Sequence, residues 1–238
     1  MHENPLIVAL DLPRDEALAL ADSLRGRVRW LKVGMTLFYS EGPAIVTELR
    51  DMGFNVFVDL KLHDIPHQVS GAATSIAGLG AGMFTVHASG GLAMMRAAVE
   101  ASRAAASVAG VAAPAVLAVT VLTSTDDAGL AEVGVAHDAA EQVRLLAELA
   151  LAAGVDGVVC SPREAALMRE LLGGDALIVT PGVRPAGTES GDQARIATPH
   201  AALAAGASHL VIGRPITADP TPAQAVQRIL DEIEGVRP

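Results

Sequence analysis

The chain has 238 residues, of which 51% are hydrophobic and 18% are charged, with a formal net charge of −10 and one cysteine, Cys160. This composition excludes a disordered chain and a disulfide-bonded scaffold, and it argues against a nucleic acid or an anionic membrane as partner because either requires a clustered basic surface. The apolar runs are too short for a signal peptide or a membrane span, so we expect a soluble, cytoplasmic protein that forms one domain over residues 1–238.

Eight short apolar runs recur along the chain, and each is followed by a segment whose apolar residues recur at steps of three and four. The runs are nearly continuous in apolar residues, as is typical of parallel strands that are covered on both faces. Eight strand–helix repeats predict an α/β fold, a (β/α)8 TIM barrel, with the functional site at the carboxyl ends of the strands. The predicted strands are Leu6–Leu12, Val28–Gly34, Phe54–Leu62, Met83–Ala88, Ala115–Thr123, Gly157–Ser161, Leu177–Val183 and His209–Ile216. The predicted helices are Asp15–Arg25, Pro43–Met52, His67–Ala77, Leu92–Ala106, Ala139–Ala153, Arg163–Leu172, Pro199–Ala205 and Pro222–Glu234.

Charged residues gather at the ends of the first three predicted strands. Asp59 and Lys61 occupy alternate positions of the third strand, so both side chains point to one face while the intervening leucines face the helices. Asp11 and Lys32 end the first and second strands and converge on the same mouth of the barrel. A single buried Asp–Lys pair is as often a structural ion pair as a catalytic one. A cluster of four favours chemistry, because apolar residues would fill a barrel at a lower cost in free energy.

Histidines near this cluster raise the alternative of a metal site. His63 and His67 are four residues apart with Asp64 between them. Pro66 interrupts any helix that would align the two imidazoles on one face, so we do not expect a metal ion here. His87, at the end of the fourth predicted strand, is typical of a hydrogen-bonded core histidine and receives no role.

The loops after the seventh and eighth strands are candidates for a phosphate site, a common location in βα barrels. They carry Pro181–Arg184, continuing to Gly191–Gln193, and Gly213 with Arg214. Glycine lets backbone N–H groups approach phosphate oxygens, and arginine supplies forked charged donors. Taken alone, Gly213 is equally typical of a turn and Arg214 of a surface charge, but their position favours an anion site. The glycine loop Ser89–Gly91 is a rival without a basic neighbour.

One segment and five further blocks carry a family resemblance. The segment Asp59–Pro66 resembles the signature around the catalytic lysine of orotidine 5′-monophosphate decarboxylases. That resemblance implies a barrel enzyme that converts orotidine 5′-monophosphate to UMP and CO2, the last step of UMP biosynthesis, with no cofactor and no metal. The further blocks that match in order and spacing are Ile7–Asp11, Leu31–Gly34, Thr180–Pro185, Gly191–Gln193 and Val211–Ile216.

The resemblance also implies roles for individual residues. Lys61 donates the proton to C6 of the pyrimidine, and Lys32, Asp59 and Asp64 complete an alternating array of charges. In this family the residue matching Asp64 reaches the partner's site across a homodimer interface. Gln68 stands where many members carry threonine. The implied substrate-binding residues are Asp11, Lys32, Asp59, Ile65, Gln68, Thr123, Ser124, Pro181, Arg184, Gln193, Gly213 and Arg214.

Other functions remain open at this point. A magnesium-dependent sugar-phosphate barrel, such as a hexulose-phosphate synthase or a ketogulonate-phosphate decarboxylase, shares the spacing D-x-K-x-x-D and would bind the metal through the same acidic residues. A non-catalytic phosphate-binding barrel would use the anion site without turnover. A Schiff-base aldolase is less expected, because a lysine between carboxylates is held in its charged form. The continuation His63–Pro66 and the loop Arg184–Gln193 favour the nucleotide enzyme.

Overall fold

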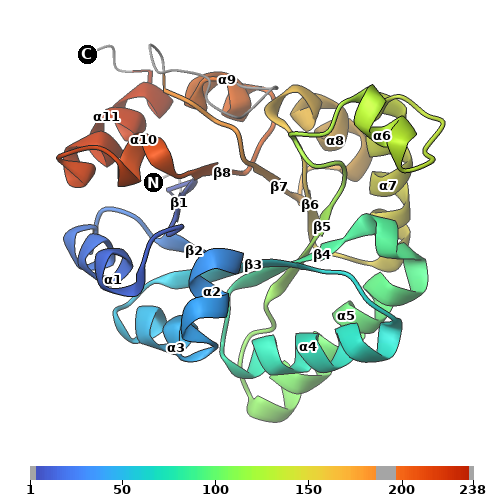
Figure 1. Cartoon of the computed structure of the whole chain (residues 1–238), viewed down its shortest axis with the longest axis horizontal. Helices are drawn as coiled ribbons and strands as arrows, with labels where there is room; N and C mark the ends of the chain where they lie inside the picture. The colour runs from blue at the N-terminus through green and yellow to red at the C-terminus, as the bar shows by residue number, and fades with distance from the viewer. Residues whose placement is uncertain (1–3, 186–196, 236–238) are drawn as a thin grey trace.

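The computed structural model describes residues 4–185 and 197–235. Eight parallel strands, each hydrogen-bonded to the next in chain order, close into a barrel through the pairing of the first strand with the last. Figure 1 looks into this ring of strands and shows the helices arranged around it. The predicted TIM-barrel fold is confirmed. The strands are β1 (Leu6–Ala9), β2 (Trp30–Gly34), β3 (Asn55–Leu62), β4 (Met83–His87), β5 (Ala115–Val119), β6 (Gly157–Val159), β7 (Leu177–Thr180) and β8 (His209–Ile212).

All eight predicted helices are present, with ends that lie within three residues of the prediction. Three short helices, α2, α6 and α10, were not predicted, because segments of four to seven residues are too short to show a helical period. In the described part of the chain, no helix combines the length and the apolar character needed to cross a bilayer. The helices are α1 (Arg14–Ser23), α2 (Met35–Glu41), α3 (Ala44–Asp51), α4 (Pro66–Gly78), α5 (Gly91–Ala109), α6 (Asp127–Glu132), α7 (Ala139–Ala153), α8 (Ala165–Leu172), α9 (Pro199–Ala204), α10 (Arg214–Thr217) and α11 (Pro222–Ile233), with 3-10 turns η1 (Ala88–Gly90) and η2 (Pro162–Glu164).

The strands begin within two residues of the predicted positions, but several end earlier. β5 ends at Val119 rather than Thr123, and β8 ends at Ile212 rather than Ile216. The prediction for the end of β8 was wrong because apolar residues continue past the strand into α10. Pro215 lies in the first turn of that helix, where its missing N–H costs little. The residues beyond the strand ends therefore form the rim of the barrel.

Local capping contacts explain where several helices begin and end. The Asp138 carboxylate accepts a hydrogen bond from the backbone N–H of Glu141 at 2.8 Å and caps α7. Gly154, with a φ of 77°, follows the last residue of this helix. The Thr198 hydroxyl accepts from the N–H of Ala201 at 3.2 Å and caps α9. These contacts satisfy N–H groups that a helix leaves without partners.

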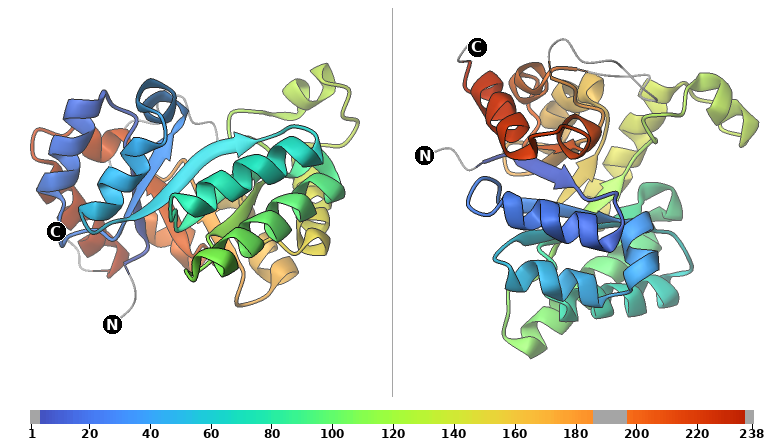
Figure 2. Two further views of the ribbon diagram at one scale, coloured as in Figure 1. Left: turned by 90° about the horizontal axis from the view of Figure 1, so that it is seen from below. Right: turned by 60° about the vertical axis from the view of Figure 1, so that its left-hand side comes forward.

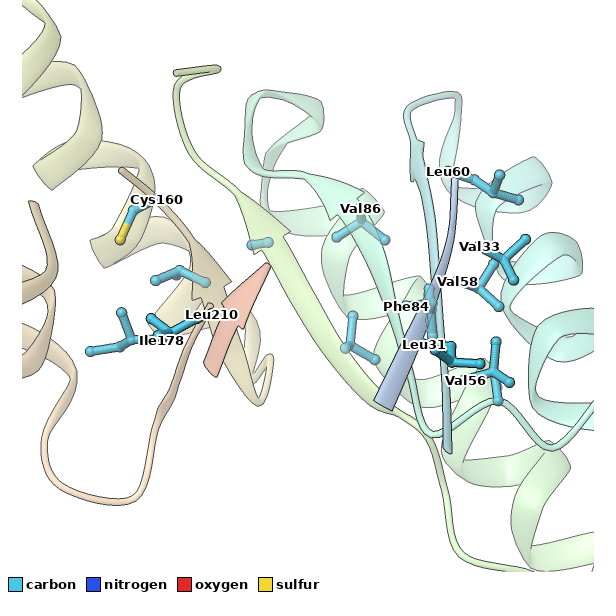
Figure 3. Packing of buried hydrophobic residues seen from close by; sticks show 14 of the residues in the cluster. Leu31, Val33, Val56, Val58, Leu60, Phe84, Val86, Cys160, Ile178 and Leu210 are labelled. Carbon is cyan, nitrogen blue, oxygen red and sulfur yellow. The ribbon is translucent and has the colours of Figure 1, made fainter. Parts of the chain in front are cut away.

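Two apolar layers enclose the strands. The outer layer lies between strands and helices, and Figure 3 shows Leu31 and Val33 of β2 gathered with Val56, Val58 and Leu60 of β3 on one side of these strands. Outside β3 and β4, α4 and α5 lie side by side (Figure 2). The inner layer fills the barrel and takes one side chain from each odd-numbered strand, which is typical of such barrels. These inner residues are Ile7, Phe57, Leu117 and Val179, joined by Ala9, Met83 and Val211.

Candidate active site

A cavity of about 590 Å³ opens at the carboxyl ends of the strands. Its volume is within the range of small-molecule binding sites. Residues of β1, β2, β3, β5, β6 and β8 and residues that follow β7 line the cavity, so residues far apart in the sequence meet there. The lining includes ten of the candidates named from the sequence: Asp11, Lys32, Asp59, Lys61, Thr123, Ser124, Pro181, Arg184, Gly213 and Arg214.

Three other candidates do not line this cavity, and a fourth cannot be placed. Asp64, Ile65 and Gln68 are exposed and follow β3 outside the cavity. The Asp64 carboxylate accepts a hydrogen bond from the backbone N–H of Ile65 at 2.7 Å. Gln193 lies outside the described residues. The single chain therefore brings Asp11, Lys32, Asp59 and Lys61 together, but it leaves Asp64 directed elsewhere.

The four charges form an unbroken chain of alternating sign. Lys32 Nζ lies 3.2 Å from Asp11 Oδ1 and 3.5 Å from Asp59 Oδ2. Lys61 Nζ donates a hydrogen bond to Asp59 Oδ1 at 2.9 Å. The side chains of Lys32 and Asp59 are only 10% and 13% exposed. Desolvating such groups is costly, and the alternation offsets that cost because each buried charge has an opposite neighbour.

Asp59 is the centre of this arrangement. Burial raises the pKa of its carboxyl, but the positive charges of Lys32 and Lys61, together with hydrogen bonds from Lys61 and Thr85, lower it by more. The pKa of Asp59 therefore lies below its ordinary value of 3.8. At neutral pH the residue is a carboxylate that holds both ammonium groups in place.

The two lysines of this cluster are the only lysines in the sequence, and the other fifteen basic residues counted with them are arginines. The difference between lysine and arginine matters for catalysis, because a guanidinium does not release a proton in proteins whereas an ammonium can. Lys32 and Lys61 are thus the only side chains in the sequence with an ammonium group that can donate a proton.

The end of β3 departs from regular strand geometry at Lys61. Val58 pairs with Phe84 of β4, but the next paired residue is Leu62, which lies opposite Val86. Lys61 has a φ of 54°, a left-handed conformation that costs free energy in any residue with a Cβ. The Lys61 side chain still reaches the cavity beside Asp59, as the alternation of residues predicts.

Thr85, on β4, is a buried polar residue that sequence reasoning missed. Its hydroxyl oxygen accepts a hydrogen bond from the backbone N–H of Lys61 at 2.8 Å and donates to Asp59 Oδ1 at 3.0 Å. Threonine is common in strands. For that reason the sequence alone does not distinguish Thr85 from an ordinary strand residue.

Gly34 leaves the space that the ion pair between Asp11 and Lys32 occupies. It is the residue of β2 that lies opposite Asp59. A Cβ at this position would lie 2.7 Å from Asp11 Oδ1 and 2.8 Å from Lys32 Nζ, both closer than real contacts allow. The glycine is therefore required here for room, since its φ of −90° is open to any residue.

A second polar region of the cavity carries arginines. Arg184 follows β7, and Arg214 follows β8 at the start of α10. Because β7 is four strands away from β3 in the closed eight-stranded order, Arg184 and Lys61 approach the cavity from opposite sides of the barrel. Gly182, Thr217 and apolar side chains that were not predicted as site residues complete the lining. The apolar residues are Ala9, Phe57, Val119, Val121, Leu122, Val159, Cys160 and Val211.

The histidines near β3 are arranged as a pair of rings. The centroids of the His63 and His87 rings lie 5.4 Å apart, with tilted planes. Burial lowers the pKa of His87, and the positive charges of His63 and Lys61 lower it further against the opposing effect of Asp59. His87 therefore adds no positive charge beside Lys61 at neutral pH. Within residues 4–185 and 197–235, no group of three or more His, Cys, Asp or Glu residues is placed to hold a metal ion.

Comparison with known proteins places this chain in a family. A sequence model of the "Orotidine 5'-phosphate decarboxylase / HUMPS family" matches residues 4–229. An orotidine 5′-phosphate decarboxylase from Halorhodospira halophila is 54% identical over 229 residues, which cover 96% of this chain and 95% of that protein. The enzyme of the same name from Paramagnetospirillum magneticum is 49% identical over 231 residues, which cover 97% of this chain and 98% of that protein.

The fold agrees with this result. The crystal structure of orotidine 5′-phosphate decarboxylase from Lactobacillus acidophilus superposes with a TM-score of 0.86 at 40% identity, covering 97% of this chain and 99% of that one. Both the identity and the coverage are high enough to relate whole chains rather than a shared scaffold. The chain therefore belongs to the orotidine 5′-phosphate decarboxylase / HUMPS family.

Proposed function

We propose that this protein decarboxylates orotidine 5′-monophosphate to UMP and CO2. The observation that carries the proposal is the Lys61 ammonium, hydrogen-bonded to the buried Asp59 carboxylate in a cavity that arginines also line. The names of the similar proteins support the same substrate. The proposal needs a site that binds a phosphate at one side and stabilises negative charge on carbon at the other.

The cavity offers a binding site for each part of the nucleotide. Arg184, Gly213 and Arg214 would hold the phosphate, since arginine forks match phosphate oxygens. Asp11 and Lys32, which both line the cavity, would bind the ribose hydroxyls. Thr123, Ser124 and the backbone of Pro181 would border the pyrimidine. This orientation places C6 and its carboxylate on the side of the cavity where β3 ends.

The reaction requires a charged proton donor beside C6. The bond from C6 to the carboxylate carbon breaks, CO2 leaves, and the electron pair remains on C6 as a vinylic carbanion. The Lys61 ammonium stabilises that negative charge as it develops and then transfers a proton from Nζ to C6. Lys61 becomes a neutral amine and regains a proton from solvent after UMP leaves. Asp59 holds the Lys61 ammonium in position through their hydrogen bond until the transfer occurs.

Contacts to the phosphate contribute to the rate although they lie far from the reacting bond. Binding energy gained from a remote group can be used to order the site and exclude water. A dry site strengthens the interaction between the lysine and the carbanion. The part of the cavity that Arg184 and Arg214 line thus contributes to catalysis as well as to binding.

A single assay tests substrate, reaction and metal independence together. We expect the purified protein to consume orotidine 5′-monophosphate in the presence of excess EDTA at the same rate as without it, because the proposed steps use only side chains of the protein. The loss of the substrate's ultraviolet absorbance measures this rate. Full inhibition by EDTA that Mg²⁺ reverses would favour a metal-dependent sugar-phosphate enzyme instead.

The position of Asp64 leads us to infer a homodimer in which this residue completes the partner's site. Asp64 is exposed, and its carboxylate accepts from the N–H of Ile65, whereas the Lys61 ammonium pairs with Asp59. Exposed apolar side chains lie nearby in the topology: Ile65 follows β3, while Met35 and Tyr39 belong to α2, directly after β2. Because β2 and β3 are paired and parallel, these segments leave the barrel at the same edge. A second subunit on this edge would cover them.

Mixing two inactive variants tests this arrangement. Lys61→Ala and Asp64→Asn each disable every site of their own homodimer. In a mixed dimer, one site combines the intact Lys61 of one subunit with the intact Asp64 of the other. Random exchange of equal amounts is therefore expected to restore activity to about one quarter of the wild-type sites. Absence of any recovery, with exchange verified by mass spectrometry, would show that Asp64 acts within its own subunit. Full activity of Asp64→Asn by itself would show that Asp64 has no role.

A further inference from the structure

We propose that Thr85 is a positioning residue for the decarboxylation, whose hydroxyl holds the backbone of Lys61 and the carboxylate of Asp59 in their reactive arrangement. The inference rests on the proposed function, because it assigns a role relative to the proton donor of that reaction. Thr85 is 1% exposed and does not line the cavity, so it would act through its neighbours rather than on the substrate.

The single hydroxyl proton settles the direction of both hydrogen bonds. Lys61 N–H can only donate, so the Thr85 oxygen accepts from it at 2.8 Å. The Asp59 carboxylate can only accept, so the Thr85 proton points to Asp59 Oδ1 at 3.0 Å. The same Oδ1 accepts from Lys61 Nζ at 2.9 Å. Thr85, Asp59 and Lys61 thus form a closed ring of contacts that ties the lysine at its backbone and at its ammonium.

The irregular end of β3 explains why a side chain is needed at this point. Between Val58 and Leu62 the pairing with β4 shifts, and within this stretch the Lys61 N–H donates to a side chain of β4. Among the described residues, Lys61 is the one residue other than glycine with a positive φ. Such a conformation persists only where the surroundings hold it. The Thr85 hydroxyl accepts from the Lys61 N–H at this irregular point and thereby stabilises the conformation.

Removing the hydroxyl should therefore move the reacting group rather than weaken substrate binding. Thr85→Val keeps the β-branched shape but leaves the Lys61 N–H without its acceptor and Asp59 without one donor. A displacement of about 1 Å at a reacting group can cost about 10²-fold in rate. We expect kcat to fall by about 10²-fold, with a much smaller change in KM.

Two variants separate the hydroxyl from general packing. Thr85→Ser retains the hydroxyl and loses a methyl group, and it is expected to keep kcat within about fivefold of wild type. Thr120→Val is the matched control, because Thr120 is also a buried threonine, 4% exposed, whose hydroxyl donates to the backbone oxygen of Val159 at 3.1 Å. It removes an equivalent hydroxyl from the barrel and is expected to leave kcat unchanged.

A second measurement reads the proposed contact directly. Because the sequence contains only Lys32 and Lys61, protein labelled with [15N]lysine gives two backbone amide signals, one from each residue. In Thr85→Val we expect the Lys61 amide to exchange with solvent at least about tenfold faster, while the amide of Lys32 is unaffected. A defect in folding alone would accelerate both.

The outcomes that overturn the inference are distinct from those that overturn the proposed function. Three outcomes would each refute the role of Thr85. The first is a kcat of Thr85→Val within about twofold of wild type, and the second is an equal loss of kcat in Thr85→Val and Thr85→Ser. The third is a loss of kcat in Thr120→Val equal to that in Thr85→Val. If Thr85→Val does not fold, Thr85→Ala removes the same hydroxyl and is judged by the same outcomes. Lys61→Ala, measured in parallel, tests the proposed function itself: activity in that variant would refute the decarboxylation mechanism whatever Thr85 does.

Discussion

Lys61→Ala is expected to lower kcat by at least about 10⁴-fold, because it removes both the general acid and the charge that stabilises the carbanion. The barrel should remain folded. Asp59 keeps Lys32 at 3.5 Å and the Thr85 hydroxyl at 3.0 Å, so the carboxylate is not left buried without partners. The rate of absorbance loss under saturating orotidine 5′-monophosphate measures the effect, and circular dichroism with size-exclusion chromatography verifies the fold.

Lys61→Arg is the matched control for this prediction. It retains a positive charge beside Asp59 but cannot release a proton in the working pH range. We expect substrate binding to be preserved and turnover to remain very low. Near-native turnover by purified Lys61→Ala would contradict the assignment of the proton donor. Full activity of Lys61→Arg would instead show that charge alone is sufficient.

Arg214→Ala is expected to reduce kcat/KM for orotidine 5′-monophosphate by about 10²-fold or more, because hydrogen bonds to charged groups contribute roughly 1.5–3 kcal/mol each. Unphosphorylated orotidine has no group for Arg214 to bind, so its much slower reaction should be unaffected by the substitution. The ratio of the two effects is the quantity to measure. It isolates the phosphate contact from any general disturbance of the cavity.

A surface arginine provides the control for charge. Arg144, on α7, pairs with Glu141 and Glu148 and does not line the cavity. Arg144→Ala changes the net charge by the same amount and is expected to leave both substrates unaffected. Equal losses on orotidine and on its phosphate in Arg214→Ala would reject a role in phosphate binding.

The sequence predicted the fold and the charged residues on β3 that line the cavity, but it predicted the ends of the strands less accurately. Apolar runs and helical periods are local, so the eight strands were found with starting points within two residues of those observed. The alternation in β3 predicted that Asp59 and Lys61 share the cavity, and both do. The ends of the strands were less accurate, because apolar residues past Ile212 form a turn of helix rather than more strand.

The sequence by itself determined the barrel, the face on which Asp59 and Lys61 lie and the family to which the chain belongs. These follow from local patterns of apolar residues and from short motifs. Only the tertiary structure decided which side chains hold the lysine. Thr85 meets Lys61 across 24 positions of sequence, and it does so because the pairing of β3 with β4 shifts at that point. The room beside Gly34 likewise exists only once neighbouring strands are in register. Contacts of this kind depend on how two strands align in space, and no local period in the sequence encodes that alignment.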